Sequence, residues 1–456
     1  MIAPARRAAF RILLQIETTD AHSDDLLRSP EVDALSAADR HLTTMLVMGT
    51  LRWQIALDAR IRPLLSRPDT KLSPEAATAL RMGAYQLLHL DRVPAHAVLN
   101  DSVELVKRGK ERGAAGMVNA VLRKLQRTTD SGQRTDEAGR PQTARELAAR
   151  WAHPAWMLER WARRYGINAA EAICRWDQEP AAPAVRADVK TEIDGVATEP
   201  GAFLACARRV IRGDVGRSDA FRTGEIRIQD EASQLVAELL ADWPVLIARA
   251  DEQPVRVLDL CAAPGGKTAI LAERLPTAEI TAVDVSRKRL DAMRKMLPPA
   301  VAERIRFEVG DATKMQLQPE YDRILCDVPC SGTGTMARNP EIRLRVTEAD
   351  LARQQERQRA ILRAGLAGVR PGGRLVYSTC SLESEENEKV VESALRDVPE
   401  FCAVPIEGIL DRLATQGVLT SGGRERLRSA TAGPYLRTIP GVHPCDGFFA
   451  AVLERS

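Results

Sequence analysis

Residues 255–284 read VRVLDLCAAPGGKTAILAERLPTAEITAVD, and the pattern of this stretch decides the fold of the C-terminal half of the chain. Short apolar runs at 255–260 and 280–284 predict two strands, and the residues at 268–274 predict a helix between them. The alternation continues, with strands expected over 305–309, 323–326, 375–378 and 447–453 and helices over 287–296 and 348–367. Strands that alternate with helices predict an α/β fold with a parallel, doubly wound sheet.

The N-terminal part of the chain has a different pattern. Apolar residues recur at three- and four-residue spacing, for example at Leu42, Met45 and Leu46, which predicts an all-helical domain over residues 1–127. Residues 128–143 are rich in Ser, Gly, Asp and Arg without apolar periodicity, and they predict a linker. A smaller unit is expected over 144–250, followed by the sheet-containing domain over 251–456.

Length and composition narrow the class of protein. The chain has 456 residues, too many for one ordinary domain, and 45% of them are hydrophobic, which is typical of a globular protein. Because no run of about eighteen apolar residues occurs, we expect no membrane-spanning helix and no membrane partner. The eight cysteines form no CxxC pair, so neither a disulfide framework nor a metal site is expected.

Two further features bear on location and partners. The basic opening of the chain runs without a break into an amphipathic stretch, so it reads as the first helix of a domain rather than a targeting peptide. Reduced thiols and a cytoplasmic location are therefore expected. The net charge of +3 supports a nucleic-acid partner only weakly, because charge must cluster to bind phosphates.

In a parallel sheet, ligands bind beyond the carboxyl ends of the strands. The first expected strand is followed by Cys261, Ala262, Ala263, Pro264, Gly265, Gly266 and Lys267. The two glycines allow the backbone to approach a ligand closely, and the next helix offers free N–H groups at its start. The end of this stretch imitates a phosphate-binding Walker A motif, but Cys261 stands where that motif requires glycine, which argues against a nucleotide hydrolase.

Acidic residues follow the next two strands. Asp284 ends the second strand, at the usual place for a carboxylate that binds ribose hydroxyls. Asp311 follows the third strand, where a carboxylate can bind the amino group of an adenine. Together with the glycine-containing loop, these acids predict a cofactor that carries a nucleoside and no phosphates.

Thiols follow the last two parallel strands. Asp327 and Cys330 lie in the sequence DVPCSGTG after the fourth strand, and Cys380 lies in STCS after the fifth, with Glu383, Glu385, Glu386 and Asn387 close behind. Cys326 lies inside a strand and is interpreted as a small buried hydrophobe. Cys330 and Cys380 lie past the strand ends among Gly, Ser and Thr, where burial explains them less well.

These motifs resemble the Fmu/Sun (RsmB-type) 16S ribosomal RNA cytosine-5 methyltransferases over nearly the whole chain. The resemblance implies a Rossmann-like methyltransferase sheet and S-adenosylmethionine as the cofactor, bound through the 261–267 loop, Asp284, Asp311 and Asp327. It also implies an N-terminal NusB-like RNA-binding domain, indicated by MGTLR at 48–52 and VPAHA at 93–97, and a small α+β subdomain over 144–250.

The resemblance implies a role for each thiol. Cys380 corresponds to the family's nucleophile and Cys330 to the thiol that assists product release. A thiolate that adds to carbon 6 of cytosine makes carbon 5 nucleophilic, and Asp327 is suited to hydrogen-bond the ring nitrogen 3 and the amino group. The positive sulfonium of the cofactor and Lys267 are expected to help lower the pKa of the attacking thiol.

The expected partner is 16S ribosomal RNA, either free or in an assembling small subunit, and the chain is expected to be a monomer. The basic run at residues 107–127 is a candidate for phosphate contacts. Two alternatives stay open at this point. One is a transfer-RNA cytosine-5 methyltransferase, and the other is a NusB-like RNA-binding factor with an inactive methyltransferase domain.

Overall fold

The computed structural model describes residues 2–130, 141–188, 190–242 and 254–456, which form two compact units. Unit 1 comprises Met1–Pro180 together with Met336–Arg345, and unit 2 comprises Ala181–Thr335 together with Val346–Ser456. Most of the linker expected over 128–143 lies outside the described residues. Within those residues, no helix combines the length and the apolar character needed to cross a membrane.

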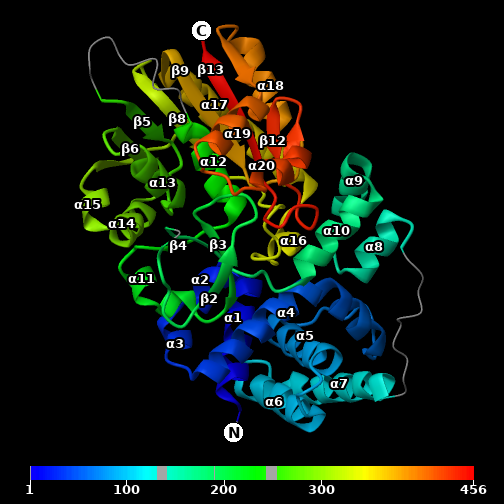
Figure 1. The fold of residues 1–456 in the computed structure, drawn as a ribbon. Helices are drawn as coiled ribbons and strands as arrows, with labels where there is room; N and C mark the ends of the chain where they lie inside the picture. The colour runs from blue at the N-terminus through cyan, green and yellow to red at the C-terminus, as the bar shows by residue number, and fades with distance from the viewer. Residues whose placement is uncertain (1, 131–140, 189, 243–253) are drawn as a thin grey trace. The chain divides into compact units, whose positions relative to one another are not determined.

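Unit 1 is helical (Figure 1). Its helices are α1 (Pro4–Thr18), α2 (Ser23–Leu27), α3 (Pro30–Asp33), α4 (Ala37–Ile61), α5 (Pro74–His89), α6 (Ala95–Arg108), α7 (Ala115–Asp130), α8 (Ala144–Arg150), α9 (Ala155–Tyr165), α10 (Ile167–Gln178) and α16 (Ile342–Arg345). Ser36 caps α4, because its hydroxyl accepts a hydrogen bond of 3.1 Å from the backbone N–H of Asp39. Leu46, Leu80 and Leu122 lie in one shared core. The predicted helical character of the N-terminal region is confirmed.

The two units do not coincide with the boundaries expected at 143/144 and 250/251. Helices α8–α10 belong to unit 1, and so does the segment Met336–Arg345, which comes from the middle of the C-terminal half. The guanidinium of Arg343 is fully buried and donates to the backbone carbonyls of Arg52, Ala152 and Asp177. Burial lowers the pKa of Arg343 to about 10. Such long-range anchoring leaves no compositional signal in the chain, so linker-based boundaries could not show it.

Unit 2 begins with a small antiparallel sheet of order β2-β3-β1-β4. Its strands are β1 (Ala184–Arg186), β2 (Ala197–Pro200), β3 (Ala207–Arg212) and β4 (Arg227–Ile228), and α11 (Asp219–Arg222) precedes β4. Val185, Val210 and Ile226 pack in its own small core. Helix α12 (Glu231–Ala241) then leads to the large sheet.

The large sheet has the order β11-β12-β13-β9-β8-β5-β6-β7. Its parallel strands are β5 (Arg256–Asp259), β6 (Glu279–Asp284), β7 (Ile305–Val309), β8 (Tyr321–Asp327) and β9 (Val369–Thr379). Strand β5 pairs with β6 on one side and with β8 on the other. The direction in which the chain adds strands therefore reverses between β5 and β8, and this switch point is where doubly wound sheets bind ligands.

The predicted doubly wound sheet of parallel strands is confirmed, and it also has an antiparallel edge. The remaining strands are β10 (Phe401–Val404), β11 (Thr431–Ala432), β12 (Tyr435–Arg437) and β13 (Phe449–Arg455). Strand β13 pairs antiparallel with β9, β10 and β12. Residues 438–448, which join β12 to β13, contain no helix. A parallel pairing of these two strands would require a crossover, usually a helix, so the short connection produces an antiparallel edge.

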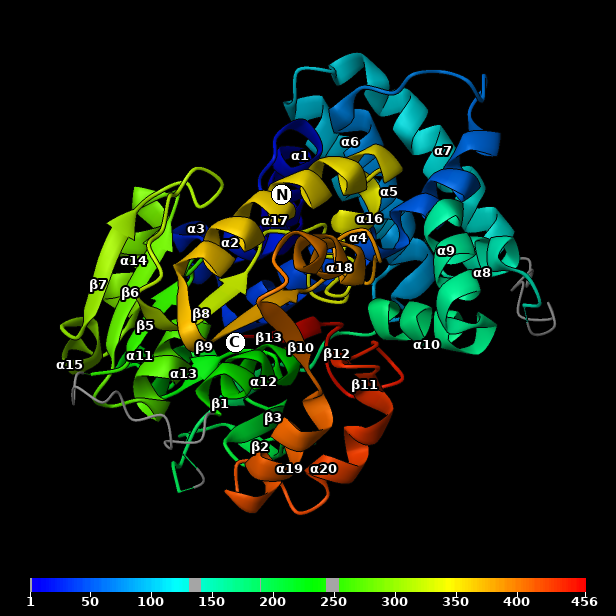
Figure 2. The same ribbon diagram turned by 90° about the horizontal axis from the view of Figure 1, so that it is seen from above.

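Alternate residues of the parallel strands face two separate cores. Val257, Leu325 and Val376 face a core shared with α12, α13 (Gly266–Arg274), α14 (Arg287–Met296) and α19 (Ile406–Thr415). Leu258, Ile324 and Leu375 face the opposite core, shared with α17 (Glu348–Gly368) and α18 (Glu388–Asp397). Figure 2 shows α17 and α18 on one face of the sheet and α12, α13 and α19 on the other. The short helices α15 (Pro299–Ala302) and α20 (Gly423–Arg426) complete the unit.

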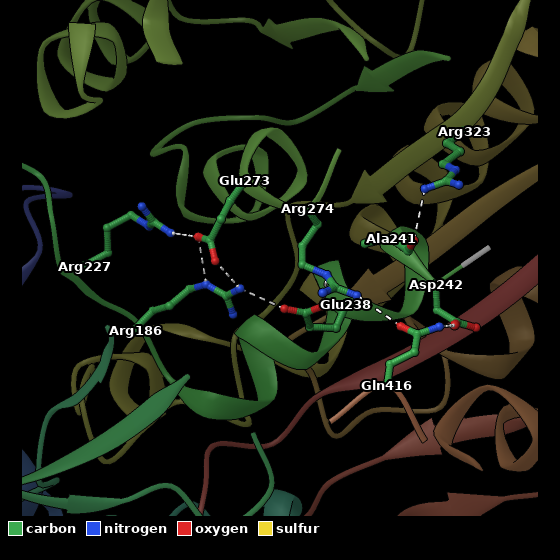
Figure 3. Close-up of polar contacts among 9 residues, drawn as sticks. All are labelled: Arg186, Arg227, Glu238, Ala241, Asp242, Glu273, Arg274, Arg323 and Gln416. Atoms are coloured by element: carbon green, nitrogen blue, oxygen red, sulfur yellow. Dashed lines mark hydrogen bonds and ion pairs between the residues drawn. The ribbon is translucent and has the colours of Figure 1, made fainter. Parts of the chain in front are cut away.

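A charged network joins the small sheet to the helices of the large one (Figure 3). The buried guanidinium of Arg186, at the end of β1, forms ion pairs of 2.9 Å with Glu238 on α12 and 2.8 Å with Glu273 on α13. Arg227 pairs with the same Glu273 at 2.8 Å, and Arg274 pairs with Glu238 at 3.0 Å. Carboxylates from helices α12 and α13 pair with arginines from strands β1 and β4, so this network fixes the small sheet relative to these two helices.

Candidate active site

The motif residues expected at the strand ends gather at the carboxyl edge of the large sheet. The register pairs Asp327 of β8 with Ser378 of β9, and Asp259 of β5 with Leu325 of β8. The loops that leave β5, β6, β8 and β9 therefore start at one edge, around the switch point. The structure brings together residues that are up to about 120 positions apart in the chain.

The loop after β5 has a backbone shape that only glycine tolerates well. Gly265 has a φ of 105°, in the left-handed region, and a Cβ there would lie 2.5 Å from the side chain of Met293. Gly266 begins α13, where a Cβ would lie 3.0 Å from the side chain of Gln229. A side chain at Gly265 would overlap Met293, and one at Gly266 would press tightly on Gln229. The two glycines therefore keep the backbone at the start of α13 open for a ligand to approach.

Asp259, at the end of β5, contacts the helix that follows this loop. Its carboxylate is buried and accepts a hydrogen bond of 2.7 Å from the hydroxyl of Thr268 on α13. Burial raises the pKa of Asp259 to about 7. This contact joins the end of β5 to α13.

Asp284 lies at the end of β6 and is buried. Its carboxylate accepts hydrogen bonds from the backbone N–H groups of Ala263, at 3.3 Å, and of Ser286, at 2.9 Å. Arg289 forms an ion pair with it at 3.3 Å. Asp284 thus ties the cofactor loop to β6, and because a carboxylate has about four acceptor positions, one remains for a ligand hydroxyl.

Asp311 follows β7 and is half-buried, with its carboxylate at the surface of the sheet edge. It accepts hydrogen bonds from the hydroxyl of Thr313, at 2.6 Å, and from its backbone N–H, at 3.0 Å. The bond from the Thr313 hydroxyl lowers the pKa of Asp311, so the group is a carboxylate at neutral pH. Beside these acids, Val285 and Val309 are 57% and 43% exposed. Exposed valines next to two carboxylates suit the flat faces and polar edges of a nucleoside.

Asp327 and Lys267 form the charged pair of the site. The ammonium of Lys267 lies 2.7 Å from one carboxylate oxygen of Asp327, and the hydroxyl of Ser378 donates to the other at 2.7 Å. Lys267 also donates to the hydroxyl of Ser233 at 2.8 Å and lies over the ring of Phe448. The described contacts of Lys267 are therefore with Asp327, Ser233 and Phe448. The expected effect of Lys267 on the pKa of the attacking thiol stays a prediction.

The two expected catalytic thiols are neighbours. The Sγ atoms of Cys330 and Cys380 lie 3.3 Å apart, although the residues are 50 positions apart in the chain. The backbone N–H of Gly334 donates to the carbonyl of Cys380 at 2.9 Å and so links the two loops. The thiol of Cys380 and burial raise the pKa of Cys330 well above its usual value. Cys330 is therefore a protonated thiol beside Cys380 at neutral pH.

The other cysteines near the sheet edge are different. Cys326 is fully buried in β8, as the sequence predicts for a small hydrophobe, and burial raises its pKa well above the usual value. Burial also raises the pKa of Cys261, and the carboxylates of Asp259 and Asp327 act in the same direction. The raised pKa values mean that neither Cys326 nor Cys261 forms a thiolate readily at neutral pH.

Sequence reasoning missed several residues that hold the site. Ser233 of α12, Gln358 of α17 and Ser331 and Ser381 beside the thiols contact the motif residues or each other. Ser331 and Ser381 lie inside the quoted motifs, so the sequence could have indicated them. Ser233 and Gln358 lie in amphipathic helices far from any motif, where no local signal distinguishes them from ordinary polar positions.

The residues of the loop fit S-adenosylmethionine. The glycine cradle at Gly265 and Gly266, the free acceptor position on Asp284 and the carboxylate of Asp311 with its flanking valines supply the contacts that a nucleoside with an amino-acid tail requires. Within the described residues, no three His, Cys, Asp or Glu side chains lie close enough to hold a metal ion.

Comparisons with known proteins agree with this arrangement. A family model described as "16S rRNA methyltransferase RsmB/F" matches residues 245–454, and one described as "NusB family" matches residues 3–127. A Bacillus subtilis protein named "Probable ribosomal RNA small subunit methyltransferase B" is 33% identical, over 99% of this chain and 98% of its own length. A Xanthomonas campestris protein named "Ribosomal RNA small subunit methyltransferase B" is 32% identical, over 99% of this chain and 97% of its own length.

A solved structure extends the likeness to three dimensions. The crystal structure of PH0851 superimposes with a TM-score of 0.79 at 25% identity, covering 100% of this chain and 99% of that chain.

Proposed function

Because the chain belongs to the RsmB/F family of 16S rRNA methyltransferases, we propose that it methylates carbon 5 of a cytosine in 16S ribosomal RNA with S-adenosylmethionine as the methyl donor. The observation that carries the proposal is the pair of thiols 3.3 Å apart, next to the ion pair of Lys267 and Asp327. Ordinary methyl transfer to a nitrogen or oxygen requires no thiol, whereas carbon 5 of cytosine becomes nucleophilic only after a nucleophile adds to carbon 6.

Cys380 is the nucleophile in this proposal. Its thiolate forms a bond to carbon 6 of the cytosine, and the electron pair of the 5,6 double bond makes carbon 5 nucleophilic. S-adenosylmethionine, when bound, supplies the methyl group that carbon 5 receives. Cys380 is half-buried and directly follows β9, whose last residue, Thr379, pairs with Phe449 of β13. The backbone N–H of Gly334 donates to the carbonyl of Cys380.

Asp327 and Lys267 bind the cytosine and stabilise its charge. Asp327 lies three residues before Cys330, and in this proposal its carboxylate accepts a hydrogen bond from the amino group of the base. The ammonium of Lys267, 2.7 Å from Asp327, offsets negative charge that develops on the ring as the thiolate adds. Ser378 and Ser233 hold this pair in place through their hydroxyls.

Cys330 assists release of the product. After methylation, a general base takes the proton from carbon 5, and the electron pair of that carbon–hydrogen bond re-forms the 5,6 double bond. The bond between Cys380 and carbon 6 breaks at the same time, and its electron pair returns to Cys380 as a thiolate. A protonated thiol 3.3 Å from that sulfur can donate a hydrogen bond to the leaving thiolate. The raised pKa of Cys330 favours the protonated form that this role requires.

The N-terminal unit supplies the RNA contacts in this proposal. Exposed cations lie at the end of α6, in the segment between α6 and α7, and along α7: Lys107, Arg108, Lys110, Arg112, Arg123, Lys124 and Arg127. Clustered exposed cations bind the phosphate backbone and make affinity salt-dependent. In this proposal the chain acts as a monomer on free RNA or on an assembling small subunit. We place the reaction in the cytoplasm, because the cysteines are free thiols and free thiols are typical of that compartment.

The proposal is tested with radiolabelled S-adenosylmethionine and undermodified 16S RNA, with modified bases mapped by bisulfite sequencing. Wild type is expected to produce 5-methylcytosine. Cys380→Ala is expected to lose activity by at least about a thousandfold, because no covalent adduct can form. Cys330→Ala is expected to accumulate a protein–RNA adduct, visible as a shifted band on a denaturing gel.

Each alternative gives a different pattern. Methylation of transfer RNA without methylation of 16S RNA would retain the chemistry and change the substrate. Cofactor and RNA binding without methyl transfer to any RNA would support an RNA-binding factor instead. Full activity of Cys380→Ala would exclude Cys380 as the nucleophile.

A further inference from the structure

A buried carboxylate lies between the two loops that carry the thiols. Glu386 is fully buried and follows β9 by seven residues. One of its oxygens accepts hydrogen bonds from the backbone N–H of Ser331, at 2.8 Å, and from the side-chain amide of Gln358, at 3.0 Å. The other accepts from the hydroxyl of Ser381, at 2.5 Å, and from the hydroxyl of Ser331. Ser331 adjoins Cys330 and Ser381 adjoins Cys380, so one side chain holds both loops.

These four hydrogen bonds use the full acceptor capacity of a carboxylate. All of them come from hydroxyl and amide groups. The two serine hydroxyls also lie 3.1 Å from each other, and the amide of Gln358 donates a second hydrogen bond of 3.0 Å to the carbonyl of Pro329, next to Cys330. Removal of the carboxylate would leave several buried donors without a partner at once, which is the costly way to break such a network.

Neighbouring residues fix the backbone of Glu386 itself. The phenolic hydroxyl of Tyr377, in β9, donates to the carbonyl of Glu386 at 2.6 Å. The side-chain amide of Asn387 donates to the backbone carbonyl of Ser381 at 2.8 Å. The hydroxyl of Thr379 donates to the side-chain oxygen of Asn387 at 2.5 Å. The carboxylate is therefore attached to the sheet on one side and to both thiol loops on the other.

We propose that Glu386 is a positioning residue that sets the separation of the Cys330 and Cys380 thiols. It touches neither thiol and acts through Ser331 and Ser381. The catalytic consequence rests on the proposed function, because only an enzyme that uses both thiols requires this spacing. The spacing itself is a property of the fold and can be measured without any substrate.

The negative charge of Glu386 has a second consequence. The hydrogen bond shared with the sulfur of Cys380, burial and the charge of Cys380 raise the pKa of Cys330, and the charge of Glu386 acts in the same direction. A neutral isostere that keeps the hydrogen bonds would therefore hold the spacing and weaken the preference of Cys330 for the protonated form. Glu386→Gln separates the two effects, since a glutamine carbonyl can accept from Ser331 N–H and Gln358 while its amide donates to the serine hydroxyls.

The test uses dibromobimane, a reagent that bridges two thiols only when they are close, on the full-length protein. The fraction of protein in which Cys330 and Cys380 are joined is measured by mass spectrometry of the digested peptides. Glu386→Ala is expected to lower this fraction severalfold, and Glu386→Gln to restore most of it. With 16S RNA, kcat of Glu386→Ala is expected to fall about a hundredfold while KM for RNA stays near that of wild type, as for displaced catalytic groups.

Two matched controls separate positioning from general damage. Glu231→Gln alters another buried carboxylate of unit 2, which accepts from the backbone N–H groups of Ala202, Phe203 and Leu204 and holds neither thiol loop. Glu385→Gln alters the adjacent residue, whose side chain contacts Ser384 and Lys389. Both controls are expected to bridge like wild type.

The outcomes are distinct. Wild-type bridging in a folded Glu386→Ala protein, or no bridging in wild type, would overturn the proposal. If Glu386→Ala does not fold, Ser331→Ala replaces it and is expected to lower bridging by removing one of the hydroxyl contacts; unchanged bridging there would equally overturn it. If wild type bridges its thiols but methylates no RNA, and Glu386→Ala loses the bridging, the positioning role is supported and only the proposed function is contradicted.

Discussion

Two buried glutamates of unit 2 are held in opposite ways. Glu238 forms ion pairs with Arg186 at 2.9 Å and Arg274 at 3.0 Å, within the network of Figure 3. Glu386 is as deeply buried, and its hydrogen-bond donors are the hydroxyl and amide groups of Ser331, Ser381 and Gln358. The first site joins elements of the framework with charge pairs, and the second joins the thiol loops with neutral donors.

The difference has a chemical reason. A guanidinium close to Cys330 would lower the pKa of that thiol and make it a second nucleophile beside Cys380. Neutral donors satisfy the carboxylate without this effect, at the cost of requiring close approach of several loops. Away from the thiols no such limit applies, and arginines can pair with Glu238 and Glu273 over longer reach.

The largest effect is expected where the framework network is broken. Arg186→Met removes the buried partner of Glu238 and should lower the free energy of unfolding by about 3–5 kcal/mol, as when one member of a buried ion pair is lost. Urea unfolding followed by circular dichroism measures this loss. Methyl transfer per folded molecule should stay near that of wild type, because the network does not touch the thiol loops.

A surface pair supplies the control. Arg209→Met removes an exposed arginine that pairs with Glu199 on the neighbouring strand, and it should cost no more than about 1 kcal/mol. A similar small loss for Arg186→Met would mean that the framework network contributes little, and the comparison between the two glutamates would lose its basis.

A smaller effect, on activity alone, is expected at the Lys267 and Asp327 pair of the strand-end site. Lys267→Met leaves Asp327 without its ammonium partner and should lower kcat about a hundredfold, the typical loss for one electrostatic contact to a developing charge. Single-turnover methyl transfer measures it. Lys389→Met, which removes an exposed lysine paired with Glu385, should change kcat little; equal losses in both variants would contradict a specific role for Lys267.

A pH dependence of stability is expected at Asp259. Burial raises its pKa from 3.8 to about 7, so between these values the unfolded chain has released the proton that the folded chain keeps. Stability is therefore lost as pH rises through this window and changes no further above it. In Asp259→Asn, the unfolding free energy measured from about pH 4 to pH 7 should lack this decrease, which amounts to at most about 1.4 kcal/mol per pH unit.

The same series of measurements has a clear contrary outcome. If Asp259→Asn and wild type show parallel pH profiles, the carboxyl group is ionised in the folded protein despite its burial. The neutral partner Thr268 would then be enough to hold a buried charge, as Ser331 and Ser381 do for Glu386.

Local sequence determined the strands, the helices and the identity of the reactive groups. The strand predicted over 305–309 and the helix over 287–296 match β7 and α14 residue for residue. The glycines of the loop predicted a backbone that a ligand can approach closely, and Gly265 has the left-handed conformation that glycine adopts without cost. Cys330 and Cys380 could be singled out as candidates because they lie past the strand ends in motifs whose chemistry is local.

Tertiary structure decided which of these groups meet. The sequence does not encode that Cys330 lies 3.3 Å from Cys380, that Lys267 pairs with Asp327 across sixty residues, or that Ser233 completes that pair. The antiparallel entry of β13 beside β9 and the membership of Met336–Arg345 in unit 1 were equally hidden. Local propensity depends on a few neighbouring residues, whereas these contacts depend on strand order and on the burial of side chains from distant segments, which only the whole folded chain determines.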